Sequence, residues 1–134
     1  MNILKAFQKK SQQPIKSFTP NVPSGLIAQT EKGYYYIKGK KRFKLVSERA
    51  MQTWNLPVIN TKEEKMAGIP VMGVLGLRDG TIAKDISDGK IYLISDSKRR
   101  HITNPDVLIW MNSSIIDVSQ KDISVHVEGD PIDE

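Results

Sequence analysis

The side chains best suited to bind a charged partner lie between Lys38 and Lys44, shortly after three consecutive tyrosines. Five of these seven positions are basic. Lysine and arginine bind phosphate and tyrosine stacks on bases, so nucleic-acid binding is one chemistry that this stretch offers. A basic hairpin turn that contacts acidic protein surfaces is the other, and we favour it. The candidate partner-binding residues here are Tyr36, Lys38, Lys40, Lys41 and Arg42, with Tyr92 as a second such tyrosine.

No combination of residues predicts catalysis, a metal site or a cofactor site. The two histidines, His101 and His126, form no close pair, and the chain has no cysteine that could serve as a thiolate ligand or nucleophile. Asp85 and Asp88 lie in a polar stretch, whereas general acid catalysis needs a buried carboxyl with a raised pKa. The glycines of 73–80 lack the spacing of a phosphate-binding loop. We therefore expect a non-enzymatic protein with no catalytic, metal or cofactor residues.

Charge is distributed unevenly along the chain. Residues 1–50 contain eleven Lys/Arg and two acids, whereas residues 51–134 contain nine Lys/Arg and thirteen acids, for a net charge of +5. The two ends are therefore expected to attract each other or the opposite ends of neighbouring copies. Contact with nucleic acid is the alternative that such asymmetry leaves open.

The elements that position these residues repeat along the chain. A shift of 56 positions places GKIYLISDSKRRHITNPDVLIW (89–110) under GYYYIKGKKRFKLVSERAMQTW (33–54). The order of residue roles is kept, which predicts a duplicated structural unit. The pairs that this shift matches include Gly33 with Gly89, Tyr36 with Tyr92, Lys44 with Arg100, Ser47 with Thr103 and Trp54 with Trp110.

Each copy is expected to form a short strand, a β-hairpin and a short helix. Alternation within the first hairpin strand places Tyr35 and Ile37 on the core face, and the same pattern in the second copy selects Ile91 and Leu93. Ser47 and Thr103 are the expected helix N-caps. Trp54 and Trp110 fall three residues after an apolar residue, which predicts core packing for both tryptophans.

The chain therefore divides into an arm, two copies and a tail, with an α+β, mainly β fold. The expected segments are an extended basic arm (1–23), repeat 1 (24–59), a linker and apolar strand (60–78), repeat 2 (79–116), and a C-terminal strand with an acidic tail (117–134). Phe7, Ile15 and Phe18 are the apolar anchors of the arm, which orders on a partner; an unordered terminus is the alternative. We expect a strand at 71–77 that is buried on both faces or pairs the two copies, and another strand around 123–127.

The second copy resembles a small tandem repeat of bacterial surface proteins and phage virion proteins. Its sequence is DGTIAKDISDGKIYLISDSKRRHITNPDVLIW (79–110). The shared pattern is an Asp-Gly turn, a strand ending in Tyr-Leu-Ile, a polar turn, Lys-Arg followed by Ile, a Ser/Thr cap and a short helix. The first copy fits more loosely, with Ser24 in place of the aspartate. The resemblance implies a module that docks to proteins or glycans, and it supplies no catalytic residues.

These features predict a structural or assembly protein of a phage-like virion, such as a decoration, neck, tail or baseplate subunit. Its expected partners are other structural proteins of the assembly, further copies of this chain among them. No apolar run approaches the ~18 residues of a membrane helix, and the start lacks the pattern of a signal peptide. We expect synthesis in the host cytoplasm and residence in the virion. The alternatives are a cell-wall or carbohydrate-binding module that uses Tyr36 and Tyr92, and a nucleic-acid-binding protein that uses the basic turns.

Overall fold

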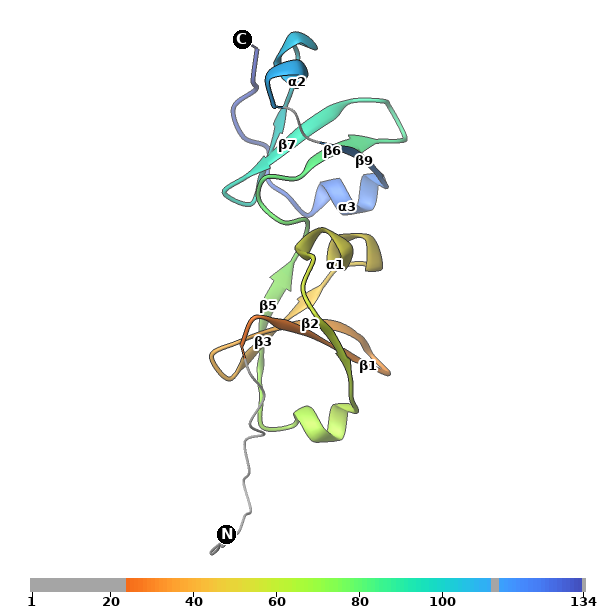
Figure 1. The fold of residues 1–134 in the computed structure, drawn as a ribbon, viewed down its shortest axis with the longest axis vertical. Helices are drawn as coiled ribbons and strands as arrows, with labels where there is room; N and C mark the ends of the chain where they lie inside the picture. Colours follow the sequence, from red (N-terminus) through yellow and green to blue (C-terminus); the bar gives the residue numbers. More distant parts are fainter. Residues whose placement is uncertain (1–23, 112–113, 134) are drawn as a thin grey trace, which may run out of the picture.

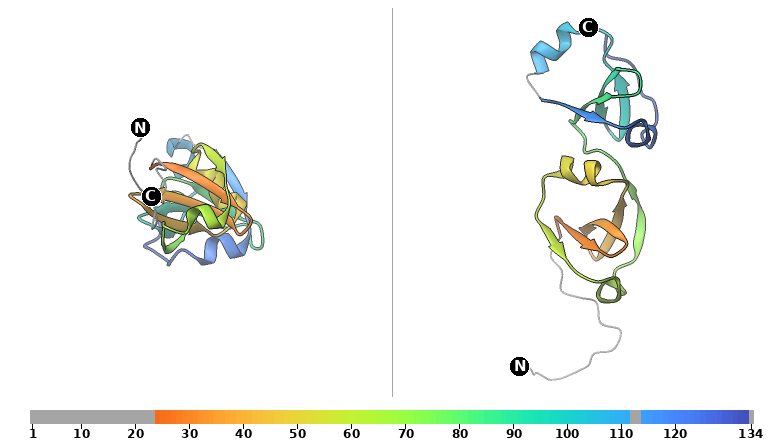
Figure 2. Two further views of the ribbon diagram at one scale, coloured as in Figure 1. Left: turned by 90° about the horizontal axis from the view of Figure 1, so that it is seen from below. Right: turned by 90° about the vertical axis from the view of Figure 1, so that its right-hand side faces the viewer.

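The computed structural model describes residues 24–111 and 114–133, which form two β-sheet units stacked along the long axis of the molecule (Figure 1). The first unit contains a five-stranded sheet and the second a four-stranded sheet. Helix α1 lies where the two units meet (Figure 1 and Figure 2). The predicted fold class, α+β and mainly β with two tandem hairpin–helix repeats, is confirmed. The predicted arm, 1–23, lies outside the described residues.

The first unit has the strand order β4-β1-β2-β3-β5. Strands β1, β2 and β3 are antiparallel, and β4 and β5 add in parallel to β1 and β3. Because β5 belongs to this sheet and the 3-10 helix η1 lies between β4 and β5 in the chain, the first unit includes residues beyond 59. Its elements are β1 (Leu26–Thr30), β2 (Gly33–Lys38), β3 (Lys41–Leu45), α1 (Glu48–Trp54), β4 (Val58–Asn60), η1 (Glu63–Met66) and β5 (Val71–Leu75).

The second unit repeats this arrangement with the strand order β8-β7-β6-β9. Strand β9 adds in parallel to β6, as β4 does to β1. Two isolated parallel bridges, Arg99 to Glu128 and Ile102 to Ile132, hold the C-terminal segment beside β8, where the first unit has β5 beside β3. Its elements are β6 (Ile82–Asp85), β7 (Ile91–Ser95), β8 (Lys98–His101), α2 (Asp106–Met111), β9 (Ile115–Val118) and α3 (Gln120–Ser124).

From the hairpin onward the units match at a separation of 57 positions, not at the predicted 56. The hairpins close on Lys38 paired with Lys41 and on Ser95 paired with Lys98. The turn before the hairpin explains the error: it contains two residues in the first unit, 31–32, and four in the second, 86–89. The glycines that end these turns, Gly33 and Gly89, are therefore not equivalent.

A slip of one residue moves every side chain of a strand to the other face of the sheet. Tyr35 and Ile37 lie in the core as predicted. Their counterparts are Tyr92 and Ile94, and Ile94 is fully buried. The prediction that Ile91 and Leu93 are the equivalents of Tyr35 and Ile37 is therefore wrong. These two side chains are partly buried on the opposite face, where they pack against the buried cluster of Ile82, Ile102 and Val107.

One hydrophobic cluster joins the two units. Ala50 of α1 is fully buried, and it packs against Leu77 of the linker, which is the segment 76–81 between β5 and β6, and against residues of the second sheet. The linker also binds α1 directly, since the Arg78 backbone N–H donates to the Thr53 hydroxyl at 3.0 Å. Arg49 donates from Nε to the Asp117 carbonyl of β9 at 3.0 Å. The remaining buried members of this cluster are Leu77, Ala83, Ile94, Val118 and Ile123.

The two helices begin differently. Ser47 caps α1 as predicted, because its side chain accepts a hydrogen bond from the Ala50 backbone N–H. The predicted cap at Thr103 is wrong. The side chain of Asn104, 57 positions after Ser47, accepts from the Asp106 N–H at 3.0 Å instead, and the Thr103 hydroxyl donates to the Ile132 carbonyl.

Three other local predictions are wrong. The apolar stretch 71–77 is not a buried strand, because its β5 portion is an edge strand on which Val71, Met72 and Val74 are at least half exposed. The segment 123–127 is not a strand, because α3 extends through Ser124. Trp110 is 78% exposed and not in the core. The corrected register explains the last error, since it places Met111 rather than Trp110 at the position of Trp54.

Candidate functional site

The tip of the β2–β3 hairpin carries three exposed lysines, Lys38, Lys40 and Lys41. Gly39 and Lys40 both have positive φ, 58° and 63°, which forms the tight two-residue turn that suits the twist of a hairpin. Lys38 and Lys41 are paired directly across the strands. Like charges directly opposite each other destabilise a sheet. The sequence therefore places an unfavourable concentration of positive charge at this tip.

No acid compensates this charge within the described residues. The salt bridge found there joins Arg42 to Glu63, at 2.9 Å between Nη1 and Oε1, and includes none of the three lysines. With respect to the described residues, the ammonium groups of the tip are therefore unpaired and can bind carboxylate or phosphate groups of a partner.

Arg42 does not share the exposure of its neighbours. Its residue is only 7% exposed, and its Nε donates to the Ile69 carbonyl at 2.8 Å. The guanidinium also binds Glu63 through Nη1 and lies 4.5 Å from the centre of the Tyr35 ring. This predicted partner-binding residue is therefore inside the first unit, where it ties β3 to η1.

The Glu63 carboxylate completes this partly buried ion pair. Burial alone would raise the pKa of Glu63, but hydrogen bonds from Thr30 and Arg42 and the charge of Arg42 outweigh it, and the pKa is lowered. The Thr30 hydroxyl donates at 2.6 Å. Burial and the nearby Glu63 charge raise the pKa of Tyr35. The cluster holds Glu63 ionised and serves the fold of the first unit.

The candidate tyrosines occupy different environments. Tyr36 is half-buried, and its ring stacks on Trp54 with centroids 5.2 Å apart. Tyr92 is half-buried against the cluster that joins the units, with its ring centroid 5.4 Å from that of His101. Because the register pairs Tyr92 with Tyr35, the two candidates are not a repeated pair of exposed rings. The three arm residues of the prediction, Phe7, Ile15 and Phe18, lie outside the described residues.

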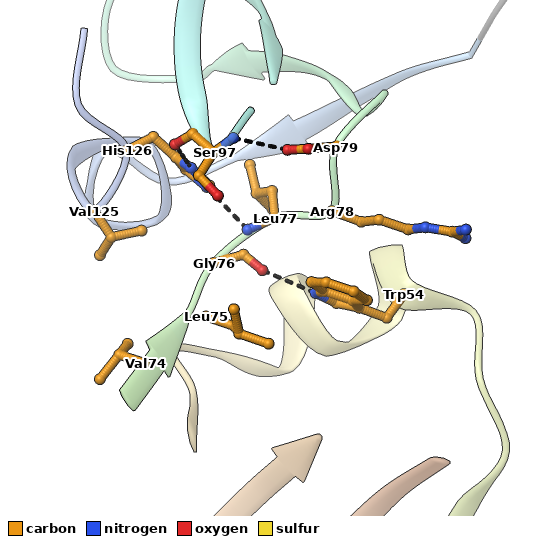
Figure 3. Close-up of a pocket in the computed structure, with 10 residues that line it drawn as sticks. All are labelled: Trp54, Val74, Leu75, Gly76, Leu77, Arg78, Asp79, Ser97, Val125 and His126. Carbon is orange, nitrogen blue, oxygen red and sulfur yellow. Dashed lines mark hydrogen bonds between the residues drawn. The ribbon is translucent and has the colours of Figure 1, made fainter. Parts of the chain in front are cut away.

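A cavity of about 510 Å³ lies where the linker passes between the units (Figure 3). Its central polar group is His126, which is only 3% exposed. Nδ1 lies 2.7 Å from the Ser97 carbonyl and Nε2 accepts from the Leu77 backbone N–H at 2.9 Å. The residues that line the cavity are Trp54, Val74, Leu75, Gly76, Leu77, Arg78, Asp79, Ser97, Val125 and His126.

The side chains of His126, Trp54 and Asp79 in this cavity all bond to backbone groups. A carbonyl only accepts and an amide N–H only donates, so His126 carries its proton on Nδ1. The Trp54 indole N–H donates to the Gly76 carbonyl at 3.0 Å, and Asp79 accepts from the Ser97 N–H. These bonds fix the linker against both units and leave neither ring nitrogen of His126 free to act as a base.

Sequence reasoning missed the structural role of His126. The signal was present in the repeat, since a separation of 57 positions maps His126 onto Ile69 and both are buried. The carbonyls of both residues also accept from an arginine of the preceding hairpin, Ile69 from Arg42 and His126 from Arg99. Alignment at 56 positions conceals this match.

The described residues contain no group of three or more His, Asp or Glu side chains placed to hold a metal ion. Within the same residues, no helix has the length and apolar character needed to cross a membrane. Comparison with protein-family models, with curated proteins and with solved structures finds no match to this chain.

Proposed function

We propose that this chain is a non-enzymatic docking protein, a structural subunit of a phage-like virion. In this proposal the tip of the β2–β3 hairpin binds an acidic surface of a neighbouring structural protein. The observation that carries the docking role is the exposure of Lys38, Lys40 and Lys41 on one tight turn without an acidic partner in the described residues. The virion context is supported by the resemblance of the repeat at 79–110.

An acidic partner would change the electrostatics of the hairpin tip. Two lysines directly opposite each other repel, and the attraction of both to an acidic partner would offset that repulsion. Complementary charge raises association rates and selects against basic partners. The hairpin itself is firmly held, because Arg42 and the fully buried Ile37 anchor its two strands. The lysines therefore project from a rigid element.

The proposal is tested by fractionating particles from cells that carry the natural gene. The chain is expected in the density-gradient band of the particles, at a fixed ratio to the major capsid protein by quantitative mass spectrometry. The triple variant Lys38→Glu, Lys40→Glu and Lys41→Glu is expected to lower incorporation about tenfold or more, equivalent to about 1.4 kcal/mol.

The matched control is Lys84→Glu, Lys90→Glu and Lys121→Glu, which makes the same charge change at three exposed lysines of the second unit. It is expected to leave incorporation near the wild-type level. Absence of the chain from the particle band would refute the virion role, and equal losses in the two triple variants would refute the specific role of the hairpin tip.

Nucleic-acid binding is a second candidate, because the same three exposed lysines offer phosphate contacts. Titration with single-stranded and double-stranded oligonucleotides at about 50 and 200 mM salt separates the two functions. Affinity that falls steeply with salt and disappears in the hairpin variant would favour nucleic acid. Retained particle incorporation without measurable oligonucleotide binding would favour protein docking.

A further inference from the structure

The two most exposed large apolar side chains of the described residues lie next to each other on α2. Ile109 is 75% exposed and Trp110 is 78% exposed. Below this α2 patch, Val107 is buried in the core of the second unit, so the helix is well anchored. Tryptophan is enriched among the residues that dominate the binding energy of protein interfaces.

The corresponding helix of the first unit is not exposed in this way. The second unit covers α1, where Ala50 is fully buried, and the linker binds Thr53. Among the described residues, α2 has no equivalent cover over Ile109 and Trp110. Of the two equivalent helices, α1 is therefore covered by the other unit, whereas Ile109 and Trp110 on α2 are exposed.

We infer that the α2 patch binds residues 1–23 of a second copy of this chain, so that copies associate head to tail. This inference rests on the proposed docking function and specifies one partner. Residues 1–23 contain four lysines, no acid, and the apolar side chains Phe7, Ile15 and Phe18. Such a segment offers aromatic and aliphatic groups for Trp110 together with positive charge.

The second unit offers the opposite charge. Residues 79–134 contain eleven acids and six Lys/Arg. Asp106 lies one turn before Ile109 on α2. Ile132, between the acids Asp130 and Asp133, packs in the cluster that supports α2. The end of the second unit that carries α2 therefore offers both acidic and apolar side chains, which complement the basic and apolar residues of 1–23.

The positions of the two surfaces favour a second copy over the same chain. The Ser24 hydroxyl accepts from the Gly39 N–H, so the described chain begins beside the lysine hairpin of the first unit. Helix α2 lies at the far end of the second unit (Figure 1). A contact between opposite ends of two molecules is heterologous and repeats from copy to copy. It would also bring the lysine tip of one copy toward the acidic unit of the next.

The edge strand β5 is the rival acceptor, because Val71, Met72 and Val74 are exposed there. It belongs to the first unit, which is basic even without residues 1–23, because residues 24–78 contain ten Lys/Arg and four acids. Charge therefore opposes docking of a basic segment at β5 and favours it at α2.

The experiment measures self-association of the purified full chain and maps the contact. Light scattering on size-exclusion fractions is expected to show a mass that rises with concentration up to about 1 mM and falls with added salt. Trp110→Asp and a deletion of residues 1–23 are each expected to keep the chain monomeric. Val127→Asp is the matched control: it adds the same charge at an apolar side chain that is 71% exposed, and is expected to associate normally.

A photoreactive phenylalanine analogue at position 7 or 18 identifies the acceptor. In an equal mixture of ¹⁵N-labelled and unlabelled chains, cross-links between labelled and unlabelled peptides that contain 106–111 would support the inference. Cross-links to 71–75, cross-links confined to one chain, or a wild-type chain that stays monomeric would overturn it. Particle incorporation is measured separately, so loss of self-association leaves the proposed virion role standing.

Discussion

At the scale of the residue, Lys38 and Lys41 reduce the stability of the hairpin while they supply charge for docking. They face each other across the hairpin, with Lys40 between them in a turn of positive φ that costs a non-glycine residue about 1 kcal/mol. Arg42, next in sequence, is buried and fully engaged. The four basic residues of 38–42 therefore divide into three lysines that cost stability at the surface and one arginine that holds the unit together.

A charge reversal at Lys38 is expected to stabilise the isolated protein while weakening docking. Lys38→Glu replaces a repulsive cross-strand pair with an attractive one, and should raise the free energy of unfolding by roughly 0.5 to 1 kcal/mol in urea denaturation. Lys40→Glu makes the same charge change without a cross-strand partner and is expected to gain less. Equal gains in the two variants would show that net charge, and not the cross-strand pair, sets the effect.

The lowered pKa of Glu63 predicts how stability depends on pH. An unfolded glutamate has a pKa of about 4.3, so the folded state binds fewer protons than the unfolded state as pH falls through this value. The stabilisation is present above that pH and is lost as pH falls through the lower, folded pKa. Urea denaturation between pH 7 and pH 3 should therefore show the wild type losing its advantage over Glu63→Gln at acidic pH.

Two observations check this assignment. Glu64→Gln changes an exposed neighbour and keeps the pair of Arg42 with Glu63, so it is expected to retain the wild-type profile. A constant difference between wild type and Glu63→Gln across the whole pH range would contradict the ionised pair as its source.

At the scale of the element, the linker after β5 is fixed by close backbone packing. A Cβ on Gly76 would lie 2.5 Å from His126 Nε2 and 2.8 Å from a Val125 methyl. The Gly76 carbonyl accepts from Trp54, and Leu77 donates to His126. The glycine thus lets one short segment contact both units, as Figure 3 shows.

Gly76→Ala is expected to destabilise the protein by roughly 1 to 3 kcal/mol, because His126 and Val125 must move and the hydrogen bond to Leu77 is strained. Thermal or urea denaturation measures the loss. Gly73→Ala is the matched control on β5, since its Cβ would meet Phe43 at an ordinary 3.6 Å. A loss for Gly73→Ala as large as that for Gly76→Ala would contradict the close approach at His126 as the cause.

The elements also show what the sequence could predict. The hairpins, the two helices after them and the duplication follow from local patterns of glycine, β-type residues and a Ser47 cap. The strand register of the second copy does not follow from these patterns. The turn at 86–89 is two residues longer than its counterpart in the first unit, so Gly89 does not correspond to Gly33. The lysine tip was predictable from composition, whereas the burial of Arg42 depends on Glu63, 21 positions away. Contacts of that range leave no local pattern.

At the scale of the whole molecule, the units depend on each other through α1. Ala50 belongs in sequence to the first unit and in packing to the core of the second. The bonds from Arg49 to Asp117 and from Trp54 to Gly76 add to that attachment. Separation of the units would expose Ala50 and Leu77 together, so the joint between the units is part of the second core rather than a flexible linker.

This shared core predicts one cooperative unfolding transition. Ile37 and Ile94 are equivalent, fully buried residues of the two units, and Ile→Ala at such sites costs about 2 to 5 kcal/mol. Each substitution is expected to shift the whole transition. Backbone amide hydrogen exchange in urea reports on each unit separately, through β2 for the first unit and β7 for the second. In both strands, Ile37→Ala and Ile94→Ala should lower protection at the same urea concentration. If Ile37→Ala affects only β2 and Ile94→Ala only β7, the units unfold independently and the core at Ala50 does not couple them.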